Sequence, residues 1–248
     1  MLKTALEAAK KGGFLAEKYF NNLPKVNFKS DKSPFTIADI ETEKLIRKII
    51  SSKYPDHGII GEELPPINPK SNIQWVIDPI DGTRDFVRGI PFWATYIAVL
   101  KTNKPILGVV FMPSTNDMMT AQLGESAFLN GKKTKVSKTK KLSDAYISFG
   151  QLKRFEKQKK VRELVNLCKT ASASRGYGNL GFKFLIEGKI DISLESYGGL
   201  YDFAAPSIIL KEAGGEFSDF SGKFSLTTGN GVYSNGLLHQ QIIKILNS

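Results

Sequence analysis

The chain has very few of the side chains that bind zinc or form disulfides. Its 248 residues include one cysteine, Cys168, and two histidines, His57 and His239. A single cysteine excludes an internal disulfide, and two histidines exclude the common zinc sites, which use several His and Cys ligands. Any divalent metal must therefore be held mainly by oxygen. We expect Cys168 to be a core thiol on a helix face, and both histidines to lie at the surface.

Long apolar runs are also missing. The run Ile106–Pro113 is far too short to cross a bilayer. The first residues, MLKTALEAAKKGGF, lack the apolar stretch of a secretory signal. We therefore expect a cytoplasmic protein with no membrane partner.

The charge is unbalanced. Lys and Arg number 35 and Asp and Glu 24, which gives a net charge of +11 and favours anionic partners such as phosphates, nucleic acid or acidic lipid. Basic residues cluster in Lys132–Lys141 and Lys153–Arg162, which could form a nucleic-acid surface or a solvated loop and helix face. Phe155 is the one aromatic residue available there for base stacking, so we favour the solvated surface and expect no nucleic-acid partner.

Hydrophobic patterning divides the chain into two halves, 1–127 and 128–248. The first half predicts two helices followed by antiparallel strands at Trp75–Ile77, Ala94–Leu100, Ile106–Met112 and Asp117–Leu123. The second half predicts strands at Ala145–Phe149 and Ile190–Leu194, alternating with helices at Val161–Cys168, Leu180–Glu187, Phe203–Ala213 and Leu237–Leu246. The alternation predicts an α/β fold built in layers.

The segment DPIDGT, residues 78–83, is the most informative part of the sequence. An apolar strand leads into Asp78, and Pro79 and Gly82 favour a turn from which Asp78 and Asp81 could project together. Carboxylates bind Mg²⁺, which in turn bridges to phosphate oxygens. If Thr83 opens a helix, its free N–H groups could bind phosphate. The alternative is that these residues only form a turn.

Three further acidic positions have competing interpretations. Glu62 follows the apolar pair Ile59-Ile60, as in a site at a strand end, but a solvated loop has the same composition. Asp202 precedes a predicted helix and could simply be its N-cap, worth about 1 kcal/mol. Asp39 could be the acidic partner of Thr36 in a capping box.

The DPIDGT segment resembles the motif of the inositol monophosphatase family, which comprises Mg²⁺-dependent, lithium-sensitive phosphatases. The family's other elements follow in order along nearly the whole chain, as Thr36-x-x-Asp39-x-x-x-Glu43, Gly61-Glu62-Glu63, Tyr201-Asp202-x-Ala204-Ala205 and Glu212-Ala213-Gly214-Gly215. Two positions depart from the pattern. Tyr201 stands where the family has Trp, and Arg84 stands where many members have Lys.

The resemblance implies a layered α/β/α/β/α sandwich, a homodimer, and a site for two or three Mg²⁺ ions. It implies these metal ligands: Glu62, Asp78, Asp81, Asp202 and the backbone carbonyl of Ile80. The amides of Gly82 and Thr83 would hold the phosphate, while Asp39, Glu62 and Thr83 would orient the attacking water. Such two-metal catalysis needs no covalent enzyme intermediate.

Within the family, the segments 91–95, 175–179 and 191–195 most resemble the histidinol-phosphatase branch. This resemblance implies hydrolysis of L-histidinol phosphate to L-histidinol in histidine biosynthesis, with Glu195 and Asn179 facing the alcohol. That branch usually has Asp in place of Asn179. Inositol 1-phosphate or another sugar phosphate is the alternative substrate. A non-catalytic, basic nucleic-acid-binding module on the same scaffold is a remote alternative, and the intact acidic set argues against it.

Overall fold

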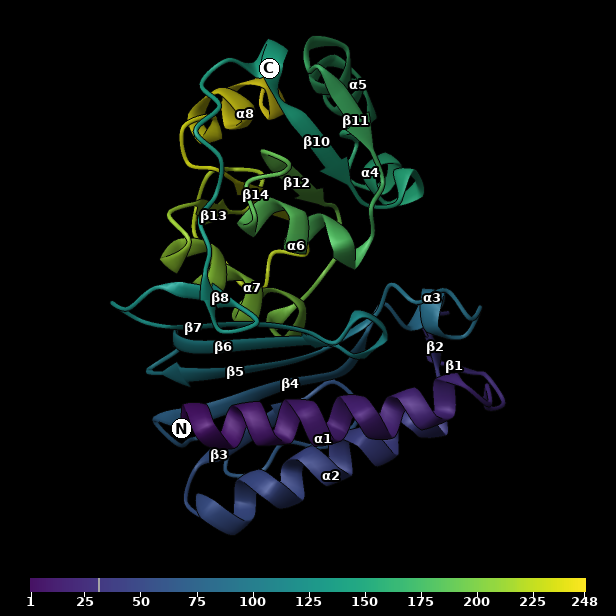
Figure 1. The fold of residues 1–248 in the computed structure, drawn as a ribbon. Helices are drawn as coiled ribbons and strands as arrows, with labels where there is room; N and C mark the ends of the chain where they lie inside the picture. Colours follow the sequence, from purple (N-terminus) through teal and green to yellow (C-terminus); the bar gives the residue numbers. More distant parts are fainter. Residues whose placement is uncertain (31) are drawn as a thin grey trace.

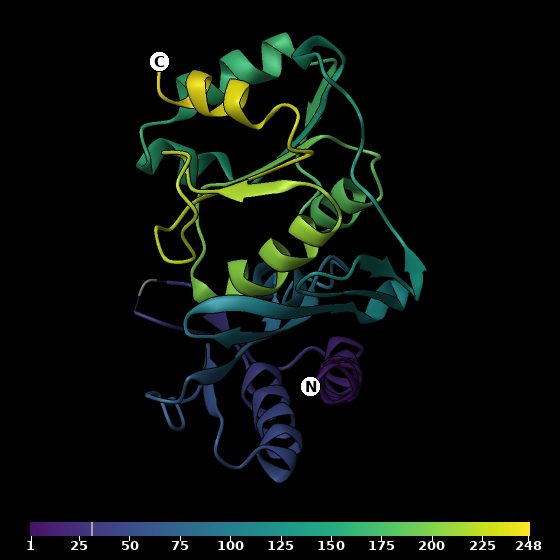
Figure 2. The same ribbon diagram turned by 90° about the vertical axis from the view of Figure 1, so that its left-hand side faces the viewer.

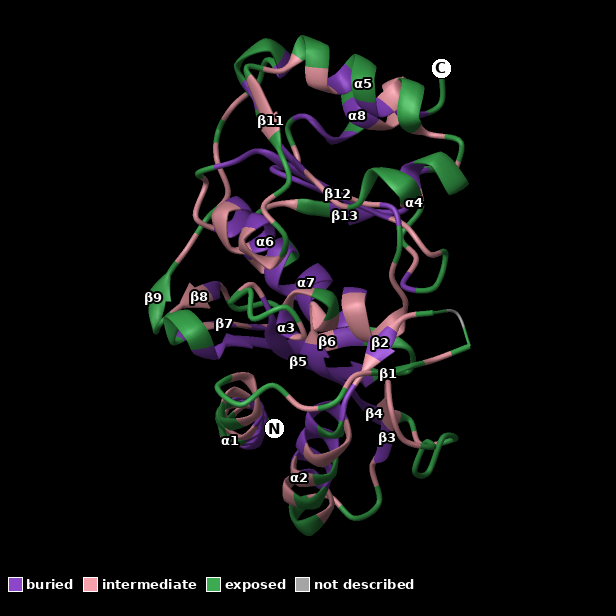
Figure 3. Cartoon of the chain, turned by 90° about the vertical axis from the view of Figure 1, so that its right-hand side faces the viewer, coloured by how far each residue is buried: buried purple, intermediate pink, exposed green. Residues whose placement is uncertain are grey.

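The computed structural model describes residues 1–30 and 32–248. Its elements stack in five layers of alternating helix and sheet, the α/β/α/β/α order that the resemblance implied (Figure 1). The long helices α1 (Leu2–Phe20) and α2 (Ile37–Lys53) lie on one side of the first sheet, and α6 (Asn179–Ile186) and α7 (Leu200–Glu212) lie between the two sheets (Figures 1 and 2). The far side of the second sheet is covered by α4 (Leu152–Lys157), α5 (Val161–Thr170) and α8 (His239–Leu246). Figure 3 shows that buried residues concentrate in the sheets and in the helical layer between them.

The first sheet has seven strands, and neighbouring strands follow chain order. They are β3 (Gly58–Gly61), β4 (Ile73–Asp81), β5 (Ala94–Lys101), β6 (Lys104–Met112), β7 (Asp117–Gln122), β8 (Ala127–Leu129) and β9 (Lys132–Lys133). The β3–β4 pair is parallel and the others are antiparallel. Thr102 and Asn103 join β5 to β6 with φ of 50° and 62°, the left-handed conformation that a two-residue hairpin needs.

The second sheet has five strands in the order β11-β10-β12-β14-β13. They are β10 (Tyr146–Phe149), β11 (Ala173–Arg175), β12 (Ile192–Glu195), β13 (Glu216–Ser218) and β14 (Gly231–Ser234). The first three are parallel and the last two antiparallel to their neighbours. A small hairpin, β1 (Asn27–Phe28) and β2 (Pro34–Phe35), lies outside both sheets.

The outer helices α1 (Leu2–Phe20) and α2 (Ile37–Lys53) pack closely against each other because α1 carries Gly12 and Gly13 at its centre. A Cβ atom on Gly12 would lie 2.7 Å from the Ile46 side chain, and one on Gly13 would lie 2.6 Å from the Phe111 ring. The two glycines therefore continue the helix and allow close approach to α2 and β6.

The central layer is formed by α6 (Asn179–Ile186) and α7 (Leu200–Glu212). A run of buried residues, 203–210, fills α7 because sheets cover the helix on both sides (Figure 3). The remaining helices are α3 (Thr83–Phe86), α4 (Leu152–Lys157), α5 (Val161–Thr170) and α8 (His239–Leu246), with 3₁₀ turns at Pro113–Thr115 and Leu142–Asp144.

The two histidines and the single cysteine differ in how deeply they are buried. His239 is fully buried, and its ring nitrogens lie 2.9 and 2.8 Å from the hydroxyls of Ser234 and Ser218, so the prediction of a surface histidine was wrong. His57 is half-buried and accepts a hydrogen bond of 3.0 Å from the indole of Trp75. Cys168 is half-buried at the edge of the core.

The helix predicted at Val161–Cys168 is present as α5, and its apolar residues are not all buried. Val161 and Val165 are 36% and 40% exposed, whereas Leu164 and Leu167 are buried.

The division at residue 127 remains a prediction; the first sheet itself continues to Lys133 in β9. Over residues 1–30 and 32–248, no helix combines the length and the apolar character needed to cross a membrane.

Candidate functional site

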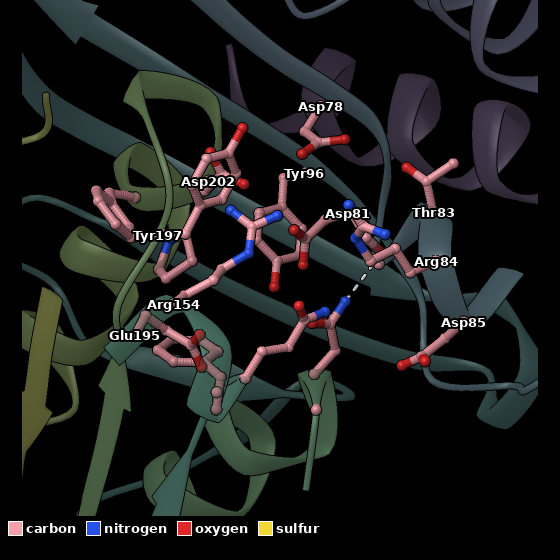
Figure 4. Close-up of a pocket in the computed structure, with 18 of the residues that line it drawn as sticks. Asp78, Asp81, Thr83, Arg84, Asp85, Tyr96, Arg154, Glu195, Tyr197 and Asp202 are labelled. Carbon is pink, nitrogen blue, oxygen red and sulfur yellow. Dashed lines mark hydrogen bonds between the residues drawn. The ribbon is translucent and has the colours of Figure 1, made fainter. Parts of the chain in front are cut away.

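Three carboxylates from two layers meet at the boundary between the halves. Asp78 and Asp81 come from the end of β4 and Asp202 from the first turn of α7, with ligand oxygens all within 4.8 Å of one another. Figure 4 shows these side chains around one cavity. The sequence predicted that the strand would end at Asp78. Instead β4 continues to Asp81, with an irregularity between Asp78 and Asp81 in its pairing with β5 that brings both carboxylates to the cavity.

The backbone of this acidic turn is fixed by three side chains. The hydroxyl of Thr95 donates to the Pro79 carbonyl and that of Thr83 to the Ile80 carbonyl, both at 2.9 Å. The amide of Asn179 donates to the Asp81 carbonyl at 2.9 Å. The three donors lie on β5, α3 and α6, so segments from both halves of the chain restrain the turn.

The contact of Asn179 changes the interpretation of that residue. We expected its amide to face the alcohol of the substrate. The residue does line the cavity, but one of its two N–H donors is used by the turn. A contact with substrate through the rest of the side chain remains a prediction.

Gly82 follows the turn with a φ of +88°, in the left-handed region that glycine adopts without strain. A Cβ atom there would lie 2.9 Å from the carbonyl oxygen of Phe92. A side chain at position 82 is therefore disfavoured by both conformation and space. The backbone of Gly82 and Thr83 stays accessible at the wall of the cavity.

Asp39 has the helix-cap role proposed for it, whereas the prediction that Asp202 is an N-cap was wrong; in both residues one carboxylate oxygen accepts the capping hydrogen bond. Asp39 Oδ2 accepts from the backbone and hydroxyl of Thr36 at 2.7 and 2.8 Å, which completes the capping box of α2. Its Oδ1 is buried without a partner among the described residues. Asp202 is the third residue of α7, not its N-cap, and its Oδ2 accepts from the amide of Gly199 at 2.6 Å.

Glu62 lies at the cavity wall directly after β3, so the alternative of a solvated loop is wrong for this residue. Its Oε1 accepts a 2.8 Å hydrogen bond from the ammonium group of Lys29, which also contacts Glu63 at 2.6 Å. Lys29 directly follows β1. It was not identified from the sequence as a site residue, because the segment 25–34 has the composition of an ordinary polar loop.

Burial, with the crowding of like charges as a smaller cause, raises the pKa values across this cluster. Burial, followed by the neighbouring carboxylates, raises the pKa of Asp202 to about 8 and drives that of Asp78 well above its ordinary range. Burial also raises the pKa of Asp39 to about 6. For Asp81, hydrogen bonds from Tyr96 and Asn179 partly oppose burial, and the pKa is raised to about 6. Such a cluster is costly when ionised and is stabilised by a cation.

The donor set fits a hard divalent cation. It consists of carboxylate oxygens, with the Ile80 carbonyl beside them, and contains neither sulfur nor imidazole. Mg²⁺ prefers such oxygen ligands. The Ile80 oxygen accepts from Thr83 yet retains a second lone pair, so it can still act as a ligand.

The whole cavity encloses about 460 Å³. The end opposite the carboxylate cluster is formed by residues of the second half of the chain. Glu195 stands there at the end of β12, and burial together with Asp81 and Asp202 raises its pKa to about 8. The guanidinium of Arg154 lies 3.3 Å from the centre of the Tyr197 ring at the same end (Figure 4). Arg154 and Tyr197 were missed because, in sequence, they belong to an exposed helix and a loop.

Comparison with known proteins agrees with this arrangement. The model of the inositol monophosphatase family matches residues 1–248. A histidinol-phosphatase of Mycobacterium tuberculosis is 33% identical over 100% of this chain and 98% of its own. A fructose-1,6-bisphosphatase/inositol-1-monophosphatase of Thermotoga maritima is 31% identical over 99% and 95%.

A solved structure of an IMPase from Thermotoga maritima superposes with a TM-score of 0.89 at 32% identity, covering 99% of this chain and 96% of that one. The layered fold is thus the one that the motifs implied. With the family match over the whole chain and the acidic cluster at the layer boundary, this chain belongs to the inositol monophosphatase family and is a phosphoric monoester hydrolase.

Proposed function

We propose that this protein hydrolyses L-histidinol phosphate to L-histidinol and phosphate in a Mg²⁺-dependent reaction. The observation that carries the proposal is that the cavity has two separate acidic regions, a carboxylate cluster at one end and Glu195 at the other. The first end suits a metal-bridged phosphate, and the second suits an alcohol that bears an ammonium group.

Asp78, Asp81, Asp202 and Glu62, with the Ile80 carbonyl, would hold two or three Mg²⁺ ions. When bound, the ions would polarise the phosphate, lower the pKa of a water and stabilise the departing alkoxide. The carboxylates supply the negative charge that retains the ions, and burial of Asp78 at 1% exposure limits competition from bulk water.

Three side chains would orient the attacking water. The Thr83 hydroxyl donates to the Ile80 carbonyl, so its lone pairs are available to accept a hydrogen bond from that water. Asp39 has a buried oxygen without a partner among the described residues, and Glu62 has a second carboxylate oxygen beyond the one held by Lys29. Each of the three can therefore accept a hydrogen bond, and because a water donates at most two, any two of them would fix the direction of its nucleophilic lone pair.

The amides of Gly82 and Thr83 would hold the phosphate. They open α3 directly after the acidic turn, and the absence of a side chain at Gly82 leaves the backbone exposed to the cavity. Because Thr95, Thr83 and Asn179 restrain the turn, these amides are held in place before substrate binds.

Glu195 would select the alcohol. A charge-assisted hydrogen bond between its carboxylate and an ammonium group is worth about 1.5–3 kcal/mol, or about tenfold to a hundredfold in selectivity. The relative named histidinol-phosphatase adds support from sequence.

A specific observation favours a second candidate, a sugar phosphate such as inositol 1-phosphate. Arg154 contributes a positive charge next to Glu195 and opposes the rise in the Glu195 pKa. A neutral polyol could use the carboxylate as an acceptor and the guanidinium as a donor. One relative carries the name fructose-1,6-bisphosphatase/inositol-1-monophosphatase.

The test is phosphate release by the purified, chelator-treated protein from L-histidinol phosphate, inositol 1-phosphate and fructose 1,6-bisphosphate, with and without added Mg²⁺. We expect activity to require Mg²⁺ and kcat/KM to be highest for L-histidinol phosphate. A higher kcat/KM for inositol 1-phosphate would select the second candidate, and full activity in excess chelator would exclude the metal mechanism. A homodimer remains a prediction of the family resemblance, and a cytoplasmic location remains a prediction from the short apolar runs of the sequence.

A further inference from the structure

A buried ion pair on α2 contacts the loop of residues 62–65, which we call the Glu62 loop. Glu43 and Arg47 are separated by one helical turn, and Arg47 Nη2 lies 2.6 Å from Glu43 Oε1. The Glu43 side chain is 0% exposed and that of Arg47 8% exposed. A buried charge pair is costly unless its remaining donors and acceptors are satisfied, so the identity of its other partners is informative.

Those other partners are backbone groups of the loop that carries Glu62. Glu43 Oε2 accepts from the amide of Glu63 at 2.8 Å, and Oε1 accepts from that of Leu64 at 3.3 Å. Arg47 donates to the carbonyls of Leu64 and Pro65 at 2.8 and 2.7 Å. The pair therefore binds both the donors and the acceptors of residues 63–65.

Gly61 supports the same arrangement from the other side of Glu62. A Cβ atom on Gly61 would overlap the carboxylate of Glu43. The Glu43 side chain thus reaches the loop through the space that this glycine leaves. The glycine before Glu62 is explained by contact with Glu43 and not by a turn, since its φ is outside the left-handed region.

The same helix also carries Asp39, one turn before Glu43. Asp39, Glu43 and Arg47 are spaced by four residues, so they lie along one face of α2. Because an α-helix is stiff, fixing the loop to Glu43 and Arg47 also fixes Glu62 relative to Asp39.

We propose that Glu43 and Arg47 are positioning residues that hold Glu62 in the geometry for binding Mg²⁺ and set its placement relative to Asp39. The inference rests on the proposed function, because it takes Glu62 as a metal ligand. Loss of such supporting hydrogen bonds typically weakens metal affinity about 10–100-fold.

The test uses E43Q and R47K in the full chain, with E41Q as the matched control. Gln has one acceptor oxygen in place of two, and Lys retains the charge of Arg but lacks its fork. Glu41 lies on the same helix and forms an exposed pair with Lys44 at 2.9 Å, so E41Q removes a similar ion pair away from the loop. Mg²⁺ binding is measured by calorimetry on each chelator-treated variant, and kcat, KM and the Mg²⁺ concentration for half-maximal activity are measured in parallel.

We expect E43Q to weaken Mg²⁺ binding at least about tenfold and to raise the half-maximal Mg²⁺ concentration equally. KM for the phosphate ester at saturating Mg²⁺ should change little, and excess Mg²⁺ should recover most of kcat. R47K should shift binding in the same direction by less, and E41Q should match the wild type.

A folded E43Q protein with wild-type Mg²⁺ affinity would overturn the proposal. If E43Q fails to fold, R47K decides: an unchanged Mg²⁺ affinity there would overturn it too. A wild-type protein that neither binds Mg²⁺ nor needs it would refute the proposed function instead.

Discussion

The two ends of the cavity are built very differently. The acidic end holds the carboxylates Asp78, Asp81 and Asp202, and the alcohol end holds Glu195. At the acidic end, the carbonyls of residues 79, 80 and 81 each accept a hydrogen bond from a side chain, and Asp78 is 1% exposed. At the end that holds Glu195, Tyr197 is 51% exposed, and Arg154, whose guanidinium lies over the Tyr197 ring, stands on the short helix α4. Three side-chain hydrogen bonds therefore hold the turn at the acidic end, whereas the other end includes a largely exposed ring.

The difference follows from what each end has to do. Metal and phosphate chemistry depends on positions held to a fraction of an ångström, whereas the choice of alcohol depends on a few charges that can vary without disturbing the core. Substitutions at the acidic end should therefore affect every substrate equally, and substitutions at the alcohol end should change preference among substrates.

The largest effect is expected from Asp78→Asn. The amide removes one charge from the metal ligands, and activity on every phosphate ester should fall by orders of magnitude. The protein should remain folded, because burial already disfavours the ionised carboxylate. Steady-state kinetics and circular dichroism check this, with the exposed Asp56→Asn as the control. Wild-type activity in Asp78→Asn would remove the basis for the proposed site.

Glu195→Gln should act on preference instead. It removes the carboxylate that would pair with an ammonium group, so kcat/KM for L-histidinol phosphate relative to inositol 1-phosphate should drop about tenfold to a hundredfold. The comparison variant is the exposed Glu125→Gln. An equal loss of kcat/KM on both substrates would indicate that Glu195 acts in catalysis. It would contradict the proposal that this end of the cavity selects the alcohol.

The raised pKa values predict how pH affects stability without metal. The pKa values of Asp39 and Asp81, raised to about 6, and that of Asp202, raised to about 8, mean that the folded state holds these protons more tightly than the unfolded chain does. Their stabilising effect is present at low pH and is lost as pH rises through about 6 to about 8. Tm of the chelator-treated protein should therefore fall by several degrees between pH 5 and pH 8, since about 1 kcal/mol shifts Tm by about 2–4 °C at this size.

Added Mg²⁺ sharpens that measurement. Metal must displace the protons, so it should raise Tm more at pH 8 than at pH 5. Asp202→Asn removes one of the titrating groups and should flatten the pH dependence of the metal-free protein. An upward trend of metal-free Tm over this range would contradict the charge crowding described for the cluster.

The smallest effect is expected from Asn179→Ala. Loss of one hydrogen bond to the Asp81 carbonyl is worth about 0.5–1.5 kcal/mol, or about twofold to tenfold in kcat. If Asn179 acts through the turn, both substrates should lose activity equally, whereas a contact with the alcohol would change their ratio. Kinetics with both esters decide between these roles, against the exposed Asn166→Ala as the control.

Local signals in the sequence predicted several parts of the structure correctly. The capping box of Thr36 and Asp39 starts α2, and the strands predicted at Ala94–Leu100 and Ile106–Met112 are present as the neighbouring strands β5 and β6. Each of these is indicated by a pattern of neighbouring residues, so the sequence pattern is sufficient to identify them. The acidic motifs likewise identified Asp78, Asp81 and Asp202, which the structure brings together.

Contacts between distant segments could not be read in this way. Hydropathy cannot distinguish an exposed histidine from one buried between two serine hydroxyls, so His239 was misplaced. Lys29 and Arg154 belong to polar segments and gain a role only because folding brings them to Glu62 and Tyr197. The pair Glu43–Arg47 has the spacing of any surface i, i+4 ion pair, and its importance arises from burial beneath the Glu62 loop.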